Sequence, residues 1–214
     1  MMEKTVVFCY GDSNTFGYDP KGSGERYPEQ VCWTTILQKL LGENYTVINE
    51  GKNGRTTAFD RPGEERNGLT EFLPRLRAHE APDVLLLMLG TNDCCKPMGL
   101  TPQSITNGLE KLVTAAEENV RTAKGQLPKI VLIAPAAVGE HYEGTIFAYQ
   151  LDDNVVRKSR ALPAFYRALA EKHGCLFLDA SDLAVSPRDC EHLTEESHKT
   201  LAERIFKLLK ENDI

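Results

Sequence analysis

Short runs of almost purely apolar residues recur along the chain at roughly regular intervals. They cover residues 5–9, 45–49, 83–89, 129–134 and 175–178. Because apolar residues follow one another without polar alternation, these runs indicate β-strands that are covered on both faces. The pattern therefore predicts five buried strands.

Longer stretches between the apolar runs are typical of helices. We predict helices over residues 33–42, 68–79, 101–123, 161–174 and 193–212, and Thr194 is suited to cap the last of them. Strand and helix then alternate along the whole chain, which predicts an α/β fold with helices on both faces of a parallel sheet. No repeat, low-complexity tract or linker stands out, so we expect residues 1–214 to form a single domain.

Two segments interrupt this alternation and are rich in glycine, proline, tyrosine and acidic residues. Residues 17–32 follow the first predicted strand, and residues 135–156 follow the fourth. Loops that follow parallel strands meet at the carboxyl edge of the sheet, where open α/β folds bind their ligands. We therefore expect both segments to shape a pocket.

Charge and composition indicate which kinds of partner are not expected. The chain of 214 residues has a formal net charge of -6, and its basic residues form no stripe interleaved with aromatic ones. Nucleic acid is thus not expected as a partner. The apolar run near the N-terminus is too short for a signal peptide or a membrane span, so we expect a cytoplasmic protein that does not enter a membrane.

The cysteines do not indicate a metal centre. There are six of them, without a C-x-x-C pair and without the histidine spacing that zinc sites use. We interpret them as free thiols and expect no metal and no organic cofactor.

Four polar segments follow predicted strands or precede the last predicted helix, and each contains a group that acyl transfer needs. They are "GDS" at 11–13, "NEGKNGRTT" at 49–57, "GTND" at 90–93 and "DCEH" at 189–192. Ser13 is a candidate nucleophile, because a nearby histidine could take its proton. His192 is the candidate base, and Asp189 lies three residues before it, where it could orient the imidazole ring.

The same segments contain candidate donors for the oxyanion that forms during acyl transfer. These are the backbone N–H groups of Ser13 and Gly54 and the side-chain amide of Asn92. Any one of the four segments alone is more typical of a turn or a helix cap. Their order behind successive strands and their complementary chemistry favour a catalytic site when they are taken together.

The four segments resemble the four sequence blocks of the SGNH hydrolases, also called the GDSL esterase/lipase superfamily, over nearly the whole chain. The Ser, Gly, Asn and His of that name fall on Ser13, Gly54, Asn92 and His192, and the resemblance makes Asp189 the third member of the triad. It also implies a flavodoxin-like fold, a three-layer α/β/α arrangement around five parallel strands. One departure is Asn14, where the family's motif has leucine.

Within the superfamily, "GDSNTFGYDP", "NEGKNGRTT" and "DCEHLTEESH" look most like the arylesterase branch. That resemblance implies a serine esterase for short-chain acyl and aryl esters; some members of the branch also transfer the acyl group to alcohols. Loop inserts in this branch often build oligomer contacts, so a homo-oligomer is compatible with the resemblance. A carbohydrate O-deacetylase or a lysophospholipase of the same superfamily is an alternative. A non-catalytic flavodoxin-like binding module is an alternative of another class.

Aromatic residues in and near the two inserts are candidates for the walls of a substrate pocket, although such residues can equally cover the core. We select Phe16 as the substrate contact, and the other candidates are Tyr18, Trp33, His141, Tyr142, Phe147 and Tyr149. Gly51 competes with Gly54 for the glycine of the second block. We favour Gly54 because it directly precedes "RTT", and we assign Gly51 to a turn of the chain.

Overall fold

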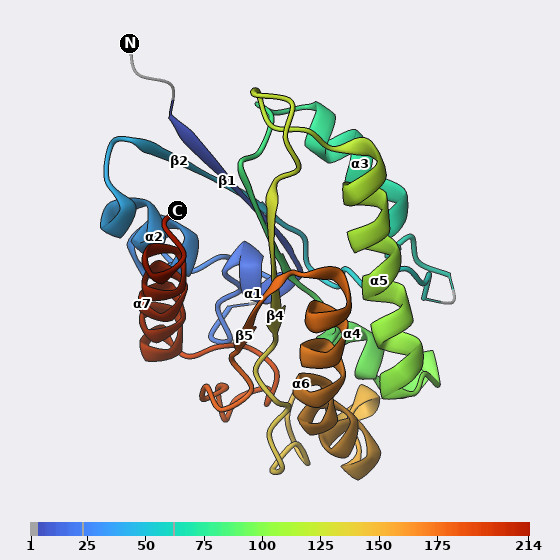
Figure 1. The fold of residues 1–214 in the computed structure, drawn as a ribbon. Helices are drawn as coiled ribbons and strands as arrows, with labels where there is room; N and C mark the ends of the chain where they lie inside the picture. The colour runs from blue at the N-terminus through green and yellow to red at the C-terminus, as the bar shows by residue number, and fades with distance from the viewer. Residues whose placement is uncertain (1–3, 23, 62) are drawn as a thin grey trace.

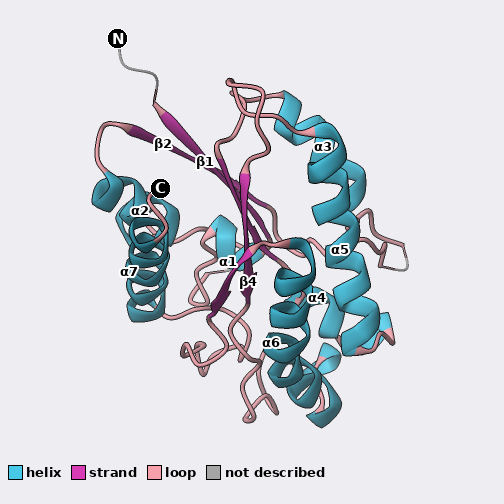
Figure 2. Ribbon diagram, viewed as in Figure 1, coloured by secondary structure: helices cyan, strands magenta, loops and turns pink. Residues whose placement is uncertain are grey.

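The computed structural model describes residues 4–22, 24–61 and 63–214, and its centre is a five-stranded parallel sheet (Figures 1 and 2). The strands are β1 (Thr5–Gly11), β2 (Tyr45–Gly51), β3 (Val84–Met88), β4 (Lys129–Ala134) and β5 (Leu176–Asp179). They lie in the order β2-β1-β3-β4-β5, and all neighbouring pairs are parallel. This is the strand order of flavodoxin-like folds, and it confirms the predicted fold class.

Five longer helices cover the two faces of the sheet (Figure 1). They are α2 (Trp33–Leu41), α3 (Gly68–Arg77), α5 (Pro102–Asn119), α6 (Asp153–His173) and α7 (Glu195–Glu211). Two short helices follow β1 and β3 directly, namely α1 (Ser13–Phe16) and α4 (Thr91–Cys94). Three 3-10 turns complete the described elements: η1 (Glu29–Val31), η2 (Lys96–Met98) and η3 (Ala148–Gln150).

The alternation of side chains along the strands divides the core into two layers. Phe8 and Leu85 face α3, α5 and α6, whereas Val7 and Leu86 face α2 and α7. Figure 1 shows α2 and α7 on one side of the sheet and α3, α5 and α6 on the other. Because β1, β3 and β4 contribute to both layers, these strands are buried along almost their entire length.

Two predictions about the elements were wrong. The edge strands β2 and β5 are only half-buried over most of their residues, since each has a neighbouring strand on one side only. Helix α6 begins at Asp153, eight residues before the predicted start at Ala161, and Asp152 caps it by accepting a hydrogen bond from the Val155 N–H at 2.8 Å.

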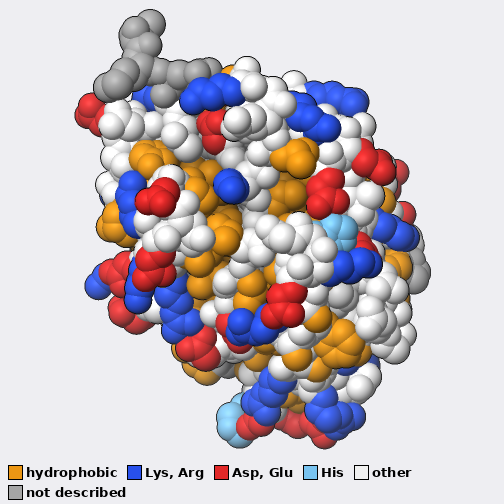
Figure 3. Space-filling view, in the orientation of Figure 1, with side chains coloured by type: hydrophobic (Ala, Val, Ile, Leu, Met, Phe, Trp, Pro, Cys, Tyr) orange, Lys and Arg blue, Asp and Glu red, His pale blue; other side chains and the backbone are white. Residues whose placement is uncertain are grey.

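Acidic and basic side chains are interspersed over the face of the molecule that Figure 3 shows. Among the helices that the structure describes, none combines the length and the apolar character required to cross a bilayer.

Candidate active site

The nucleophile candidate Ser13 lies at the first position of α1, immediately beyond the carboxyl end of β1. Asp12 caps this helix, and its carboxylate accepts a hydrogen bond from the Asn14 N–H at 2.9 Å. The side chain of Ser13 is largely buried, with 7% of its surface exposed. The turn from strand to helix therefore places the hydroxyl at the edge of the sheet, where the loops converge.

The imidazole of His192 lies directly against Ser13 although 179 residues separate them in the sequence. Its Nε2 is 2.8 Å from the Ser13 Oγ, and its Nδ1 is 2.8 Å from the Asp189 Oδ2. The second oxygen of Asp189 accepts hydrogen bonds from the N–H groups of Glu191 and His192, each at 3.1 Å. This arrangement favours the tautomer with the proton on Nδ1, which leaves Nε2 free to accept the serine proton.

The sharp turn between Asp189 and His192 depends on an unusual backbone conformation. Cys190 has a φ of 62°, in the left-handed region that residues with a side chain rarely occupy. Its thiol is buried, and burial raises the pKa of Cys190. The turn brings the Asp189 carboxylate back toward the imidazole three residues later.

Asn14, which departs from the family motif, connects α1 to the histidine loop. Its side-chain Oδ1 accepts a hydrogen bond from the Leu193 N–H at 2.9 Å, and its Nδ2 donates to the Glu191 carbonyl at 3.2 Å. The amide thus contacts the residues on both sides of His192. A leucine at position 14 could not make either hydrogen bond, so the substitution has a structural role here.

Gly54 lies on the loop after β2 and Asn92 on α4, which follows β3, and both line one cavity together with Ser13 and His192. The Nδ2 of Asn92 donates a hydrogen bond to the Arg55 carbonyl at 3.0 Å, which leaves its second amide hydrogen available to a ligand. The structure thus brings the five residues that the sequence analysis assigned to catalysis to one place.

Gly51 does not have the role of a turn that we predicted. A Cβ at Gly51 would lie 2.0 Å from the backbone nitrogen of Phe16, so this glycine allows α1 to pack closely against the end of β2. Gly54, in contrast, has a φ of 75° and lines the cavity.

Phe16 does not line the cavity, so the geometry does not support the predicted substrate contact. The guanidinium of Arg26 lies 5.8 Å from the centre of its ring instead. Trp33, another candidate, is buried in the core, and its Nε1 donates a hydrogen bond to the Asn14 carbonyl at 3.0 Å. His141 and Tyr142 are likewise absent from the cavity wall.

The aromatic side of the cavity is formed by Tyr18, Phe147 and Tyr149. The ring of Tyr18 stacks on the imidazole of His192, with 4.0 Å between the ring centres and 23° between the planes. Phe147 lies 5.7 Å from the same imidazole. These contacts restrict the orientation of the histidine ring and shield it from water.

The rest of the cavity lining, which we call the polar wall, consists mainly of polar residues, and the cavity has a volume of about 170 Å³. Glu191 is a buried acid there; its carboxylate accepts a hydrogen bond from the Gln150 Nε2 at 2.9 Å. Burial raises the pKa of Glu191. The remaining polar residues of this wall were not predicted from the sequence; they are Asn53, Arg61, Arg66, Thr91 and Gln150.

Asp12 and Asp93 brace the loops beneath the site. Asp93 accepts hydrogen bonds from the Thr57 hydroxyl at 2.6 Å and from the Thr57 N–H at 3.0 Å. Burial raises the pKa of each aspartate to about 6, against the effect of these hydrogen bonds. Among the described residues, no group of three or more His, Cys, Asp or Glu side chains is arranged to hold a metal ion.

Replacing Gly54 with alanine should lower kcat by roughly 10²- to 10³-fold, the effect of losing one oxyanion donor. A Cβ at this position would lie 1.9 Å from the Arg66 Nη1, which donates a hydrogen bond to the Asn53 carbonyl, and the φ of 75° disfavours any side chain, so alanine displaces the Arg66 guanidinium and strains the turn that presents the N–H group. Initial rates with a short-chain aryl ester measure the effect. Gly99→Ala is the matched control: its φ of 60° is also left-handed, but nothing lies within 4 Å of the added Cβ. Equal kcat values in the two variants would contradict the assignment of Gly54.

Comparisons with known proteins found similar sequences and structures. The model of the GDSL-like lipase/acylhydrolase family matches residues 9–199. An arylesterase of Vibrio mimicus is 32% identical over 120 residues, an alignment that covers 55% of this chain and 50% of the relative. The match thus spans only half the length of that curated relative.

Two solved structures are similar over almost their entire length. A carbohydrate acetylesterase family member from Sinorhizobium meliloti has a TM-score of 0.89 and 32% identity, with 97% of this chain and 98% of that chain covered. The aryl esterase of M. smegmatis has a TM-score of 0.84 and 29% identity, with 96% and 100% covered.

Proposed function

The chain belongs to the GDSL-like lipase/acylhydrolase family, a family of SGNH ester hydrolases, and on this premise we propose that it cleaves short-chain acyl and aryl esters through Ser13. The observation that carries this proposal is the continuous hydrogen-bonded chain from Ser13 through His192 to Asp189. Both of its distances to the imidazole nitrogens are 2.8 Å.

In the first half of the proposed reaction, the Ser13 Oγ attacks the ester carbonyl carbon while His192 Nε2 takes the hydroxyl proton. The carbonyl π electrons move to the oxygen, and the N–H groups of Ser13 and Gly54 and the amide of Asn92 stabilise the resulting charge. Collapse of this intermediate breaks the bond to the alcohol, which leaves with the proton from His192. Asp189 stabilises the imidazolium while it exists.

In the second half, a water molecule gives its proton to His192 and attacks the acyl-Ser13 carbonyl. The tetrahedral intermediate then expels the Ser13 oxygen, which recovers its proton from His192, and the carboxylic acid leaves. An alcohol in place of water would receive the acyl group by the same sequence of steps and yield a new ester.

The size and lining of the cavity favour a small substrate. A cavity volume of about 170 Å³ has room for a short acyl group, whereas a long lipid chain would have to extend beyond it. Tyr18, Phe147 and Tyr149 offer aromatic surface to an aryl leaving group. Short-chain aryl esters therefore fit the site best.

A deacetylase for carbohydrates is the second candidate, because the polar wall is unusually rich in side chains that bind hydroxyl groups. Glu191 and Asn53 supply acceptors, and Arg61 supplies donors, beside the aromatic residues. The similar structure from Sinorhizobium meliloti is described as a carbohydrate acetylesterase family member, which is consistent with this candidate.

A series of esters tests the function and separates the two candidates. We expect kcat/KM for p-nitrophenyl acetate to exceed that for the butyrate, and turnover of the octanoate to be hardly detectable, because the cavity is small. An acetylated monosaccharide measured beside this series, with released acetate as the signal, shows whether the polar wall favours a sugar. Preference for the octanoate would contradict the proposed substrate class, and a failure to hydrolyse any of these esters would contradict the proposed function.

A further inference from the structure

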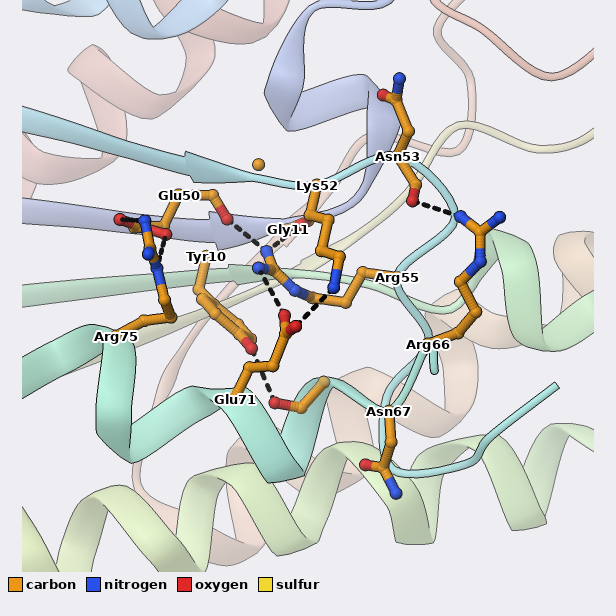
Figure 4. Close-up of polar contacts among 12 residues, drawn as sticks. Tyr10, Gly11, Glu50, Lys52, Asn53, Arg55, Arg66, Asn67, Glu71 and Arg75 are labelled. Atoms are coloured by element: carbon orange, nitrogen blue, oxygen red, sulfur yellow. Dashed lines mark hydrogen bonds and ion pairs between the residues drawn. The ribbon is translucent and has the colours of Figure 1, made fainter. Parts of the chain in front are cut away.

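One buried guanidinium connects the ends of β1 and β2 to helix α3 (Figure 4). Arg55 has 2% of its surface exposed, and its Nη1 donates hydrogen bonds to the carbonyls of Gly11, at 2.7 Å, and Glu50. Its Nη2 lies 3.2 Å from the Glu71 carboxylate on α3. The guanidinium also lies over the ring of Tyr10, 4.1 Å from its centre.

The two carbonyls that Arg55 binds mark the ends of neighbouring strands. Gly11 is the last residue of β1, two positions before Ser13, and Glu50 is the penultimate residue of β2. The side chain therefore ties the loop after β2 to the strand that leads into the nucleophile. A buried carbonyl that loses its donor is costly, so these bonds restrain the loop strongly.

The backbone of Arg55 restrains the oxyanion donors themselves. Its carbonyl accepts the hydrogen bond from the Asn92 Nδ2 at 3.0 Å, and its N–H donates to the Lys52 carbonyl at 3.1 Å, which closes a tight turn around Gly54. The residue is thus adjacent to one proposed donor in the chain and hydrogen-bonded to the other. A displacement of Arg55 would move Gly54 and Asn92 together.

We propose that Arg55 is a positioning residue that sets the geometry of the oxyanion hole. It holds Gly54 and Asn92 in a fixed relation to Ser13 without contacting the substrate. Lysine could not replace it, because a single ammonium group does not present the planar set of donors that reaches two carbonyls and a carboxylate at once. This inference rests on the proposed function, since it assigns a role to Arg55 within that reaction.

The test compares an oxygen ester with its sulfur analogue in the variant Arg55→Lys. Thiocarbonyl sulfur accepts hydrogen bonds weakly, so a displaced oxyanion hole should slow p-nitrophenyl acetate far more than p-nitrophenyl thionoacetate. We expect kcat for the oxygen ester to fall by roughly 10- to 100-fold, because the donors are displaced rather than removed, with little change in KM. The ratio of the two rates is the decisive readout, since a general loss of folded protein would lower both rates equally.

Two further variants make the comparison decisive. Glu71→Gln removes the carboxylate that pairs with Arg55 but keeps the size of the side chain, so we expect a smaller fall in the ratio of the oxygen-ester rate to the thionoester rate. This variant decides the question if Arg55→Lys does not fold. Arg75→Lys is the control: Arg75 binds the Glu50 carboxylate through two hydrogen bonds of 2.7 Å in the same region, yet it makes no hydrogen bond to the described residues of the loop after β2 (Figure 4). Its ratio should equal that of the wild type.

An unchanged ratio in Arg55→Lys and Glu71→Gln, or an equal change in Arg75→Lys, would overturn the assignment of Arg55. Failure of the proposed function would look different. In that case the wild type would hydrolyse neither ester, or its ester turnover would persist in Ser13→Ala, whatever the result for Arg55.

Discussion

Replacing Ser13 with alanine should abolish turnover of a short-chain aryl ester, with a loss in kcat of roughly 10⁶-fold, the scale measured for nucleophile removal in a serine protease. Alanine cannot form the acyl-enzyme, and no other described hydroxyl is hydrogen-bonded to the His192 Nε2. The protein should stay folded, because Asp12 still caps α1 and alanine is a good helix former. Initial rates and a thermal melt of both proteins measure the two effects.

A fluorophosphonate probe provides the matching control for this experiment. It should label wild-type Ser13, identified by mass spectrometry of the modified peptide, and should not label the Ser13→Ala variant. Ser104→Ala, a change on α5 remote from the cavity, should leave both labelling and turnover unchanged. Wild-type turnover in Ser13→Ala would remove the proposed nucleophile, and an unlabelled, inactive wild type would favour a non-catalytic binding protein.

The second large effect is expected for Asp189→Asn, which should lower kcat by about 10⁴-fold. An asparagine oxygen can still accept the hydrogen bonds from the N–H groups of Glu191 and His192, so its amide nitrogen would face the imidazole. The imidazole would then need an unprotonated Nδ1 and would carry its proton on Nε2. In that tautomer it cannot take the proton of Ser13.

Comparison with a nearby aspartate separates this effect from a change in charge. Asp182 lies on the same connection between β5 and α7, and its carboxylate pairs with Arg204 at 2.6 Å at the surface. Asp182→Asn should therefore retain the wild-type kcat. Similar rates for the two variants in steady-state kinetics would show that Asp189 does not orient the histidine.

The strands could be predicted from the sequence because a strand that is buried on both faces consists almost entirely of apolar residues. The run 129–134 coincides with β4, and the run 5–9 lies entirely within β1. The start of α6 could not be predicted in the same way. Pro163 lies inside this helix, where proline is disfavoured, so no local signal extends the predicted helix back to Asp153.

The catalytic residues of the candidate site could be predicted because the motifs that contain them follow the order of the strands in a parallel sheet. Ser13 and His192 follow from that order, since the carboxyl ends of the strands share one edge. The aromatic ring that faces the cavity could not be predicted, because the sequence does not show the direction of a side chain. We predicted Phe16 as the substrate contact, whereas Tyr18 stacks on His192 and lines the cavity. The roles of Asn14 and Arg55 rest on contacts across long sequence separations, which no local pattern records.

The distance of 179 residues between Ser13 and His192 has a consequence for the protein during its synthesis. All five strands precede His192 in the chain, so the sheet can form on the ribosome before the proposed base has emerged. Helix α7, which completes the layer with α2, is made after all the other described elements. If the two residues act together as proposed, a chain that ends before His192 has no base for Ser13 and cannot cleave esters by this route, even though all five strands have been made.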